Sequence, residues 1–371
     1  MRAKLLTASF SLLTFAPLLF SCTHQTPPAS LQTTLYVYRF DPPALIEFSQ
    51  DFQINREIPF SLPPNCGLLD LFPPPAGNFI AIELSCPGGQ TVLFLDTLSS
   101  LNAGSAPAAV SQPVTDSDSH FLAWTRDGKA AYLKVDSLGN AHIVRVDGSG
   151  KNESIPISGF TYDLAADPGN DDFTFAFSRG LGQGSELWLA KQDGRTVQRL
   201  YADPSNYISF ARYSPDGDQI AFIKIPDTQT PFTVGELWVT PATAAQGAED
   251  SNARKLADAD AGHGYAANWS PDGKRIAFVL RENPQDEQAD QLSEALISNA
   301  YIVEVASGVL TQVTHLANGR VETPFWSPSG NTLAFNAVIN DRMEVQIVEL
   351  RTGEIRSLIT ESACCPTWMR K

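Results

Sequence analysis

The chain has 371 residues, and its 26 lysines and arginines against 41 aspartates and glutamates give a formal net charge of −15. Such a surface repels nucleic acid and anionic head groups, which excludes a nucleic-acid-binding protein and attachment to a membrane through basic residues. The length allows one large all-β domain or two ordinary domains.

Residues 1–21 have the features of an export signal. A short basic start, MRAK, precedes an apolar stretch that is too short to span a membrane comfortably. The sequence LFSC, which ends at Cys22, resembles the lipobox of bacterial lipoproteins, although an ordinary signal peptide with a chance cysteine is the alternative. We expect Cys22 to carry a lipid and residues 22–33, which are polar and contain proline, to form a flexible tether.

Residues 34–371 carry a repeated motif, of which NWSPDGKRIAFVL from Asn268 is a clear copy. The copies centre on turn glycines at Gly77, Gly128, Gly169, Gly217, Gly273 and Gly330, with weak matches at Gly77 and Gly169. Their spacing, 41–57 residues, and the four short apolar segments in each unit predict a single all-β domain. The expected fold is a β-propeller of four-stranded antiparallel blades.

One unit shows the expected strands. Around Gly273 they are residues 266–270, 275–280, 299–305 and 309–314, each bounded by turn-forming residues. The second strand is continuously apolar, which predicts that stacked blades bury both of its faces.

The SPDG turns have a conformational explanation. Proline sets the backbone angle of the turn, aspartate can accept hydrogen bonds from nearby backbone, and glycine adopts the left-handed conformation. Catalytic roles for Asp216 and Asp272 would require both to reach one site, but the repeat distributes them around the ring, and Ser329 takes the same place in the next unit. We therefore predict no catalytic residue among them.

These motifs, with Trp or Tyr before SPDG and an Ile-Ala-Phe-like run after it, resemble the TolB-type repeat over about residues 66–371. This is a WD-like (WD40-like) repeat of bacterial envelope proteins, and it implies a binding or scaffolding propeller without specifying a ligand. The motifs are also similar to the propeller of prolyl oligopeptidases, which carry a separate hydrolase domain.

Both ends of the chain predict how the ring closes. CCPTW at residues 364–368 resembles ETPFW at residues 322–326, so the chain stops just after an innermost strand. Near the start, LYVYRF and ALIEFS resemble outer strands. One blade built from both termini would remove two exposed sheet edges, and we therefore prefer seven blades to six.

Four cysteines besides Cys22 are candidates for structural disulfides in an oxidising compartment. Cys66 and Cys86 lie about equally far from the turn near Gly77 and could face each other. Cys364 and Cys365 could form a vicinal disulfide or pair elsewhere. Their spacing does not fit a metal site, and we expect no metal and no other cofactor.

Loops between second and third strands, and between blades, should share one face. The long segments 225–235 and 281–299 fall there, either as binding loops or as mobile excursions. Candidate binding residues expected on this face are His120, Tyr162, Asp163, Asn206, Tyr207, His263, Tyr265, Arg320 and Glu322, with Arg212 and Asn268 on innermost strands.

The preferred functional hypothesis is a lipid-anchored, extracytoplasmic, monomeric and non-enzymatic module that binds a protein, peptide or glycan partner in the bacterial cell envelope. The alternative is an envelope hydrolase or lyase with a metal or acidic site at the channel mouth. A similar propeller, that of oligogalacturonate lyase, uses histidines and a metal near its axis, but the offsets of His120, His263 and His315 from their tryptophans do not repeat. A third hypothesis is the interaction domain of a larger envelope machine.

Overall fold

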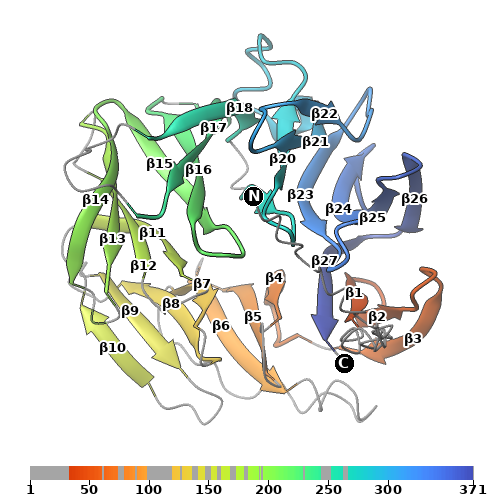
Figure 1. Cartoon of the computed structure of the whole chain (residues 1–371). Helices are drawn as coiled ribbons and strands as arrows, with labels where there is room; N and C mark the ends of the chain where they lie inside the picture. Colours follow the sequence, from red (N-terminus) through yellow and green to blue (C-terminus); the bar gives the residue numbers. More distant parts are fainter. Residues whose placement is uncertain are drawn as a thin grey trace, which may run out of the picture. The chain divides into compact units, whose positions relative to one another are not determined.

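Seven antiparallel β-sheets form the described part of the chain (Figure 1). The computed structural model describes residues 33–370 except 61, 74–78, 88–89, 98–118, 126–127, 136–140, 147–151, 157–159, 168–172, 179–182, 192, 194, 229, 244–251 and 262–265. Thr33–Lys371 form one compact unit. The predicted signal peptide, Cys22 and the tether before Thr33 lie outside the described residues.

Both ends of the chain contribute to one sheet, which we call the closing sheet. It consists of β27 (Ala363–Arg370), β1 (Thr33–Arg39), β2 (Ala44–Phe48) and β3 (Ile54–Pro59), in this order from the axis outward. Sheet 1 follows with β4 (Gly67–Phe72), β5 (Phe79–Cys86) and β6 (Gln90–Thr97). Sheet 2 has β7 (Ser119–Trp124), β8 (Ala130–Val135), β9 (Ala141–Val146) and β10 (Asn152–Pro156).

The remaining four sheets each take four consecutive strands. Sheet 3 has β11 (Phe160–Ala166), β12 (Phe173–Ser178), β13 (Ser185–Ala190) and β14 (Thr196–Asp203). Sheet 4 has β15 (Asn206–Tyr213), β16 (Gln219–Pro226), β17 (Val234–Pro241) and β18 (Arg254–Asp260). Sheet 5 has β19 (Asn268–Trp269), β20 (Arg275–Arg281), β21 (Ser298–Glu304) and β22 (Leu310–Gln312). Sheet 6 has β23 (Arg320–Trp326), β24 (Thr332–Ile339), β25 (Arg342–Glu349) and β26 (Glu354–Ile359).

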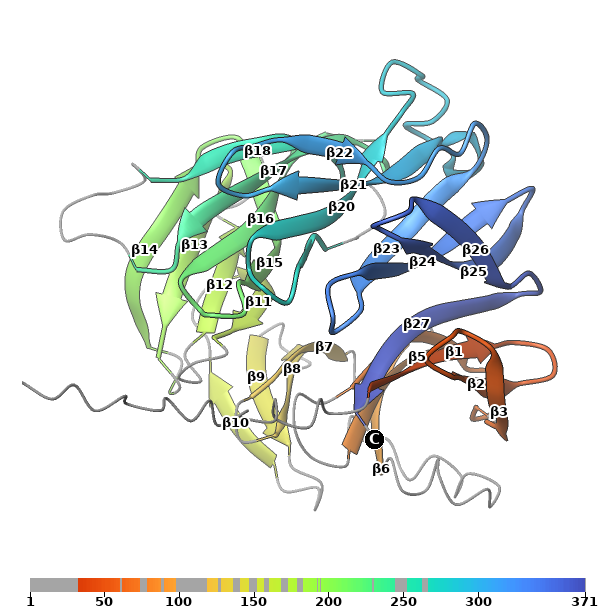
Figure 2. The same cartoon turned by 45° about the vertical axis from the view of Figure 1, so that its right-hand side comes forward.

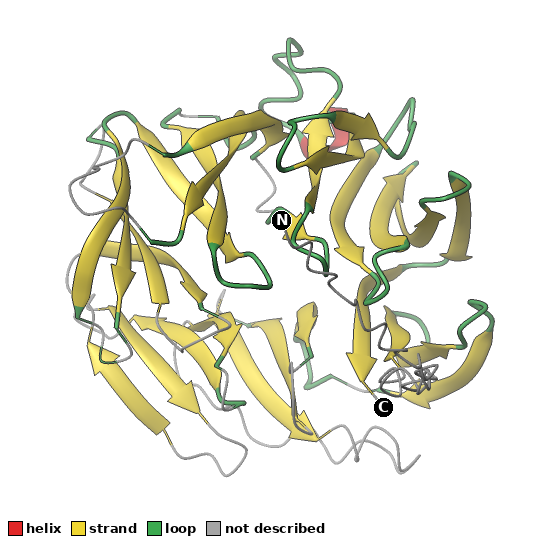
Figure 3. Ribbon diagram, viewed as in Figure 1, coloured by secondary structure: helices red, strands yellow, loops and turns green. Residues whose placement is uncertain are grey.

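The sheets follow one another in a ring (Figures 1 and 3). Each sheet contacts the next through or beside its innermost strand: β4 meets β27, β7 meets β6, β11 meets β7, β15 meets β11 and β19 meets β15. The circuit continues from β20 to β23 and from β24 back to β27. This arrangement agrees with the seven-bladed alternative and with the expected all-β propeller.

The closing sheet joins the chain ends by hydrogen bonds. β1 pairs with β27 in antiparallel register from Thr33 opposite Arg370 to Arg39 opposite Ala363. Figure 2 shows β27 lying along β1. The sequence resemblance of LYVYRF and ALIEFS to AYIVEV and VLTQVT predicted third and fourth strands, but β1 and β2 are the second and third strands of this sheet and β3 is the fourth. The position of these two strands was therefore predicted wrongly by one place, although both ends of the chain do share one sheet.

The strand directions give the ring two faces. We call the end at which each innermost strand begins the loop face, since it carries the sheet-to-sheet connections and the links between second and third strands. The opposite end carries the SPDG turns, and we call it the turn face. The segments 225–235 and 281–299 lie on the loop face, as expected.

Second strands form the core between sheets, which confirms the prediction from their apolar runs. Ile220, Ala221 and Phe222 of β16 are fully buried, and in β20 Ile276, Ala277 and Phe278 are at most 2% exposed. Burial on both faces of a strand requires neighbours on both sides, which adjacent blades provide.

The fourth strand of sheet 5 is shorter than predicted and stops at Gln312. Beyond it the Thr314 hydroxyl donates to Asn299 Oδ1 at 2.8 Å, and the Ala300 amide donates to Thr314 Oγ1 at 2.8 Å. The Val313 amide still donates to the carbonyl oxygen of Ala300 at 2.9 Å, so side-chain hydrogen bonds add to the backbone bonds where the regular strand pairing ends.

The SPDG turns are held by their own side chains. The Ser214 hydroxyl donates to Asp216 Oδ1 at 2.5 Å, and the Gln219 amide donates back to Ser214 Oγ at 3.0 Å. Gly217 has φ 82°, the left-handed conformation that the turn requires. The hydrogen bond from Ser214, followed by that from a backbone amide, lowers the pKa of Asp216. These contacts agree with the conformational explanation of the motif.

Two disulfides are present in the described residues. Cys66–Cys86 closes the open end of the β4–β5 hairpin, as the spacing suggested, because Gly67 and Ser85 are paired directly beside it. Cys364 and Cys365 form a vicinal disulfide, the first of the two alternatives left open by the sequence. All four cysteines belong to one apolar cluster between the closing sheet and sheet 1.

Tryptophans of the repeat link neighbouring sheets. The indole Nε1 of Trp124, Trp269 and Trp326 donates to the carbonyl oxygens of Phe72, Arg212 and Asn268, at 3.1, 3.0 and 2.9 Å. In each case the acceptor lies on the innermost strand of the preceding sheet. Trp368 occupies the equivalent position in the closing sheet, but its buried Nε1 has no acceptor among the described residues.

Trp326 has an acceptor for its indole N–H and Trp368 has none among the described residues, so substitutions of the two tryptophans form a matched pair. Trp326→Phe removes a buried hydrogen bond between sheets, so we expect it to lower the free energy of unfolding by about 1–3 kcal/mol more than Trp368→Phe, which removes an unsatisfied donor. Urea denaturation of both variants and wild type checks the difference. Equal losses in the two variants would show that the indole hydrogen bonds do not stabilise the ring.

Candidate functional site

The predicted binding residues occupy different depths of the loop face. Tyr207 is the second residue of β15, and Arg320 and Glu322 are the first and third residues of β23. Arg212 lies near the end of β15, and Asn268 is the first residue of the short strand β19. His120 is in β7, opposite Leu133. Tyr162 and Asp163 are in β11, and only their backbone is described. His263 and Tyr265 lie outside the described residues.

Arg320 and Glu322 hold a neighbouring segment in place. Arg320 Nε pairs with Glu322 Oε1 at 2.9 Å, and its Nη1 donates to the carbonyl oxygen of Ser293 at 3.3 Å. Ser293 belongs to the link between β20 and β21, which we call the β20–β21 insertion (residues 282–297). The ion pair is therefore an anchor for that insertion.

The β20–β21 insertion is built around a buried arginine. The side chain of Arg281 is completely inaccessible to solvent, and its Nη1 pairs with Asp290 Oδ1 at 2.8 Å. Nη2 of the same arginine donates to the carbonyl oxygen of Asp286 at 3.1 Å. A buried charge with this set of acceptors fixes the backbone around it.

Further hydrogen bonds close the insertion. Asn283 Nδ2 donates to the carbonyl oxygen of Ala295 at 2.9 Å, and the Ile297 amide donates to Asn283 Oδ1 at 3.0 Å. The Phe232 amide, from the link between β16 and β17, donates to the carbonyl oxygen of Asp290 at 3.2 Å. A 3₁₀ turn at Ser293–Ala295 is the short helical element that the sequence suggested. These contacts show that the segment is folded against the ring, and its role in binding stays a prediction.

The insertion presents an apolar side chain to solvent. Leu292 is 47% exposed, although Ala289 and Leu296 on either side are buried. Glu287 and Glu294, exposed near it, add negative charge. An exposed leucine on a fixed backbone is the kind of anchor that a partner's pocket can cover.

Bulges interrupt the innermost strands near the axis. In β15 the bulge includes Phe210, in β23 Thr323 and in β27 Cys365, and all three have positive φ, at 57°, 44° and 62°. A bulge changes the direction in which the following side chains point. The innermost strands are therefore adapted to place particular side chains at the axis.

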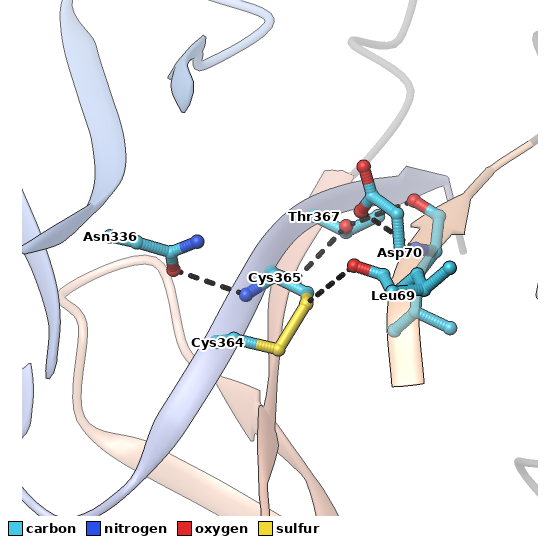
Figure 4. Close-up of a disulfide and its surroundings, with 7 residues drawn as sticks. Leu69, Asp70, Asn336, Cys364, Cys365 and Thr367 are labelled. Atoms are coloured by element: carbon cyan, nitrogen blue, oxygen red, sulfur yellow. Dashed lines mark hydrogen bonds between the residues drawn. A yellow bond between two sulfur atoms is a disulfide. The ribbon is translucent and has the colours of Figure 1, made fainter. Parts of the chain in front are cut away.

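The vicinal disulfide lies in the bulge of the closing strand (Figure 4). The Cys365 amide donates to Asn336 Oδ1 at 3.1 Å, and Thr367 Oγ1 donates to the carbonyl oxygen of Leu71 at 3.3 Å. Cys365 Sγ lies 3.6 Å from the carbonyl oxygen of Leu69, and since a disulfide sulfur carries no proton we regard this as a polar contact. The bulge thus joins β27 to both neighbouring sheets.

Asp70 was not among the predicted site residues, but it has the most distinctive electrostatic environment on the axis. Removal from water is the largest effect and raises its pKa to about 7. A hydrogen bond from the Leu71 amide lowers the pKa, the Glu83 carboxylate raises it, and the Arg212 guanidinium lowers it. No repeat signal marked Asp70, because it lies in the sheet whose SPDG turn has decayed.

Among the described residues, no group of three or more His, Cys, Asp or Glu side chains is arranged to hold a metal ion, and His315 is exposed. Among the same residues, no helix has the length and apolar character needed to cross a membrane.

The raised pKa of Asp70 predicts how the stability of the folded protein depends on pH. Its pKa is about 7 in the folded protein and near 4 in an unfolded chain, so the folded state loses stability as pH rises from about 4 to about 7. Asp70→Asn removes this loss. We expect the variant to gain about 1–3 kcal/mol relative to wild type between pH 5 and pH 8, allowing for solvent screening. Urea denaturation at both pH values measures the gain.

Asp218→Asn, at an exposed turn position, is the control for this measurement. Its difference from wild type should stay constant between pH 5 and pH 8. A constant difference for Asp70→Asn as well would contradict the assignment.

No protein-family model matches the sequence, and no curated protein matches it significantly. Among solved structures, TolB from Acinetobacter baumannii is 20% identical, with 83% of this chain and 68% of that one covered and a TM-score of 0.46. The β-propeller domain of the Trilobed protease from Pyrococcus furiosus is 14% identical over 79% of this chain and 85% of that one, with a TM-score of 0.51. A puromycin-hydrolyzing peptidase from Mycobacterium tuberculosis is 13% identical over 86% of this chain but 50% of its own, with a TM-score of 0.55. At this identity the likeness establishes the fold, a β-propeller, and leaves function to the site.

Proposed function

We propose that this chain is a lipid-anchored, extracytoplasmic propeller that binds an envelope protein through its loop face. The observation that carries the proposal is the β20–β21 insertion, which Arg281 fixes to the ring while Leu292 stays 47% exposed. A fixed loop loses little conformational entropy on binding, and an exposed leucine gains by being covered. The resemblance of the repeat to the TolB type, found in bacterial envelope proteins, supports the same compartment.

The residues near Leu292 indicate what kind of surface the partner should have. Glu287 and Glu294 are exposed on the same insertion, within a chain of net charge −15. Opposite charges speed association and exclude wrong partners. The complementary surface is therefore an apolar pocket with basic residues at its rim.

The position of Thr33 supports an orientation in which the loop face points away from the membrane. Thr33 is paired with Arg370, at the turn-face end of the closing sheet. A lipid on Cys22 would be linked to this end through the ten residues 23–32, and the eleven steps from Cys22 to Thr33 reach at most about 40 Å. The turn face would then lie toward the membrane, and the loop face would point away from it toward a partner.

We expect Leu292→Ser to weaken partner capture tenfold or more, because it removes the apolar anchor without touching the contacts of Arg281. Leu310→Ser is the matched control, since Leu310 is 42% exposed but begins β22 at the turn face. Capture of envelope proteins by the full chain in detergent, quantified by mass spectrometry, makes the comparison. A partner retained equally by wild type and both variants would place the interface elsewhere.

The lipid anchor has a separate test. Wild-type protein should partition into the detergent phase and incorporate labelled palmitate, whereas Cys22→Ser should do neither, because the acylated cysteine is lost. Phase partitioning of the two full chains measures this. Equal partitioning would show that Cys22 carries no lipid.

A further inference from the structure

Exposed apolar side chains recur where the outermost strands of three consecutive sheets begin. In sheets 5 and 6 and the closing sheet this strand starts at the turn face, where the third strand ends. Ile54 is the first residue of β3 and Ile355 the second residue of β26, and they are 55% and 39% exposed. Val309 and Leu310, where β22 begins, are 57% and 42% exposed. We call these four residues the apolar rim, and their strands lie at the outer edge of the ring (Figure 1).

The shared position distinguishes the rim from the single exposed apolar residues that every soluble protein has. Eight large apolar side chains are exposed in the described part of the chain, and five of them lie where a fourth strand starts. The fifth is Val197 of sheet 3, which is 52% exposed. The four rim residues belong to sheets that follow one another in the ring, so they can meet one surface together.

Contacts at the turn face join the three sheets of the rim. The Arg356 guanidinium of β26 lies over the ring of Phe52, in the link from β2 to β3, at 5.3 Å. Nη2 of Arg275, the first residue of β20, donates to the carbonyl oxygen of Gly330 at 3.1 Å, in the turn between β23 and β24. The turn face of sheet 6 therefore touches that of the sheet on either side.

The turn-face links of these three sheets carry no net charge. The links are residues 49–53, 270–274, 305–309, 327–331 and 350–353. They contain two acids, Asp51 and Asp272, and two bases, Lys274 and Arg351. The β20–β21 insertion on the loop face, by contrast, has five acidic residues and no basic one. In a chain of net charge −15, a layer of lipid head groups is therefore repelled less by these links than by the insertion.

The predicted tether joins the ring at the same face and in the same sheet. Thr33 is paired with Arg370 at the turn-face end of the closing sheet, whose outermost strand starts with Ile54. With a lipid on Cys22, Thr33 stays within about 40 Å of the bilayer. Tethering raises the effective concentration of the rim at the lipid surface, so contacts that are too weak to bind alone can form.

We propose that the apolar rim contacts the bilayer to which Cys22 is anchored, at the boundary between head groups and acyl chains. The inference rests on the proposed lipid anchor, and it goes beyond that anchor because it names the sector of the ring that faces the lipid. The rim side chains leave water on contact, while the balanced charges of the links stay among the head groups. The acidic insertion on the loop face points away from the membrane.

The test compares two fluorescent labels on the lipidated full chain in phosphatidylcholine vesicles that contain a lipid with a nitroxide on its head group. Four cysteines are in disulfides and Cys22 is acylated, so an introduced cysteine is the free thiol. Ala306→Cys places the label at an exposed position beside the rim, and Gln285→Cys places it on the β20–β21 insertion. We expect quenching to be about twofold or more stronger at position 306, because the nitroxide lies at the depth that the rim reaches.

Variants then assign the contact to the rim. Ile54→Ser combined with Ile355→Ser should lower quenching at position 306 by about half or more, because two of the four apolar contacts are lost. Both residues are exposed and both are distant in sequence from the label. Leu292→Ser, an exposed leucine on the loop face, is the matched control and should leave the quenching unchanged.

Equal quenching at the two label positions, or quenching at position 306 that the double substitution leaves unchanged, would overturn the proposal. Shielding of position 306 from iodide without quenching by the nitroxide would also overturn it, because a second copy of the chain would then cover the rim. A chain that does not float with the vesicles would contradict the lipid anchor and the rim contact together. A chain that floats without quenching would contradict the rim contact alone.

Discussion

The pairing of β27 with β1 is the constraint on which the rest of the structure depends. A row of stacked sheets has two exposed ends, each with an apolar face and unpaired strand edges, and it gains stability only when those ends meet. Here β27, the last strand in the sequence, is the innermost strand of the closing sheet. The junction is reinforced from both sides, since Asn336 of sheet 6 accepts from Cys365 and Leu71 of sheet 1 accepts from Thr367. Both disulfides pack into the apolar cluster beside it.

Closure also explains why the innermost strands can be irregular. Second and third strands supply most of the burial, so bulges at Phe210, Thr323 and Cys365 cost local ladder hydrogen bonds without opening the ring. Indole hydrogen bonds from Trp269 and Trp326 bind the same strands to their neighbours. Register shifts also occur between the third and fourth strands of sheets 3, 4 and 6, but only the bulges of the innermost strands redirect side chains beside the axis.

Much of this fold was predictable because its signals are local and repeated. The SPDG turn and the apolar second strand recur in the sequence, and the structure shows both at the expected places. The resemblance of residues 364–368 to an innermost strand was also correct, whereas the first two strands were predicted one place too far out. The site was less predictable, since it depends on distances across the ring. Arg212 and Asn268 were found because they precede the recurrent Ser-Pro turn by a fixed number of residues. Asp70 was missed because its raised pKa comes first from burial, with smaller effects from the Leu71 amide, Glu83 and Arg212, and no periodicity in the sequence indicates these surroundings.

The same residue type thus has two roles in this ring, and hydrogen bonding distinguishes them. Asp216 and Asp272 each accept from a serine hydroxyl and a backbone amide, which stabilises the carboxylate and lowers its pKa. Asp70 is removed from water, lies near the Glu83 carboxylate and accepts one backbone hydrogen bond among the described residues, so the protein stabilises its charge poorly. A buried carboxyl in such surroundings takes up a proton more readily than an exposed one. The dependence of stability on pH near neutrality is therefore assigned to Asp70 on the innermost strand of sheet 1, and not to the turn carboxylates of Asp216 and Asp272, whose pKa values are lowered.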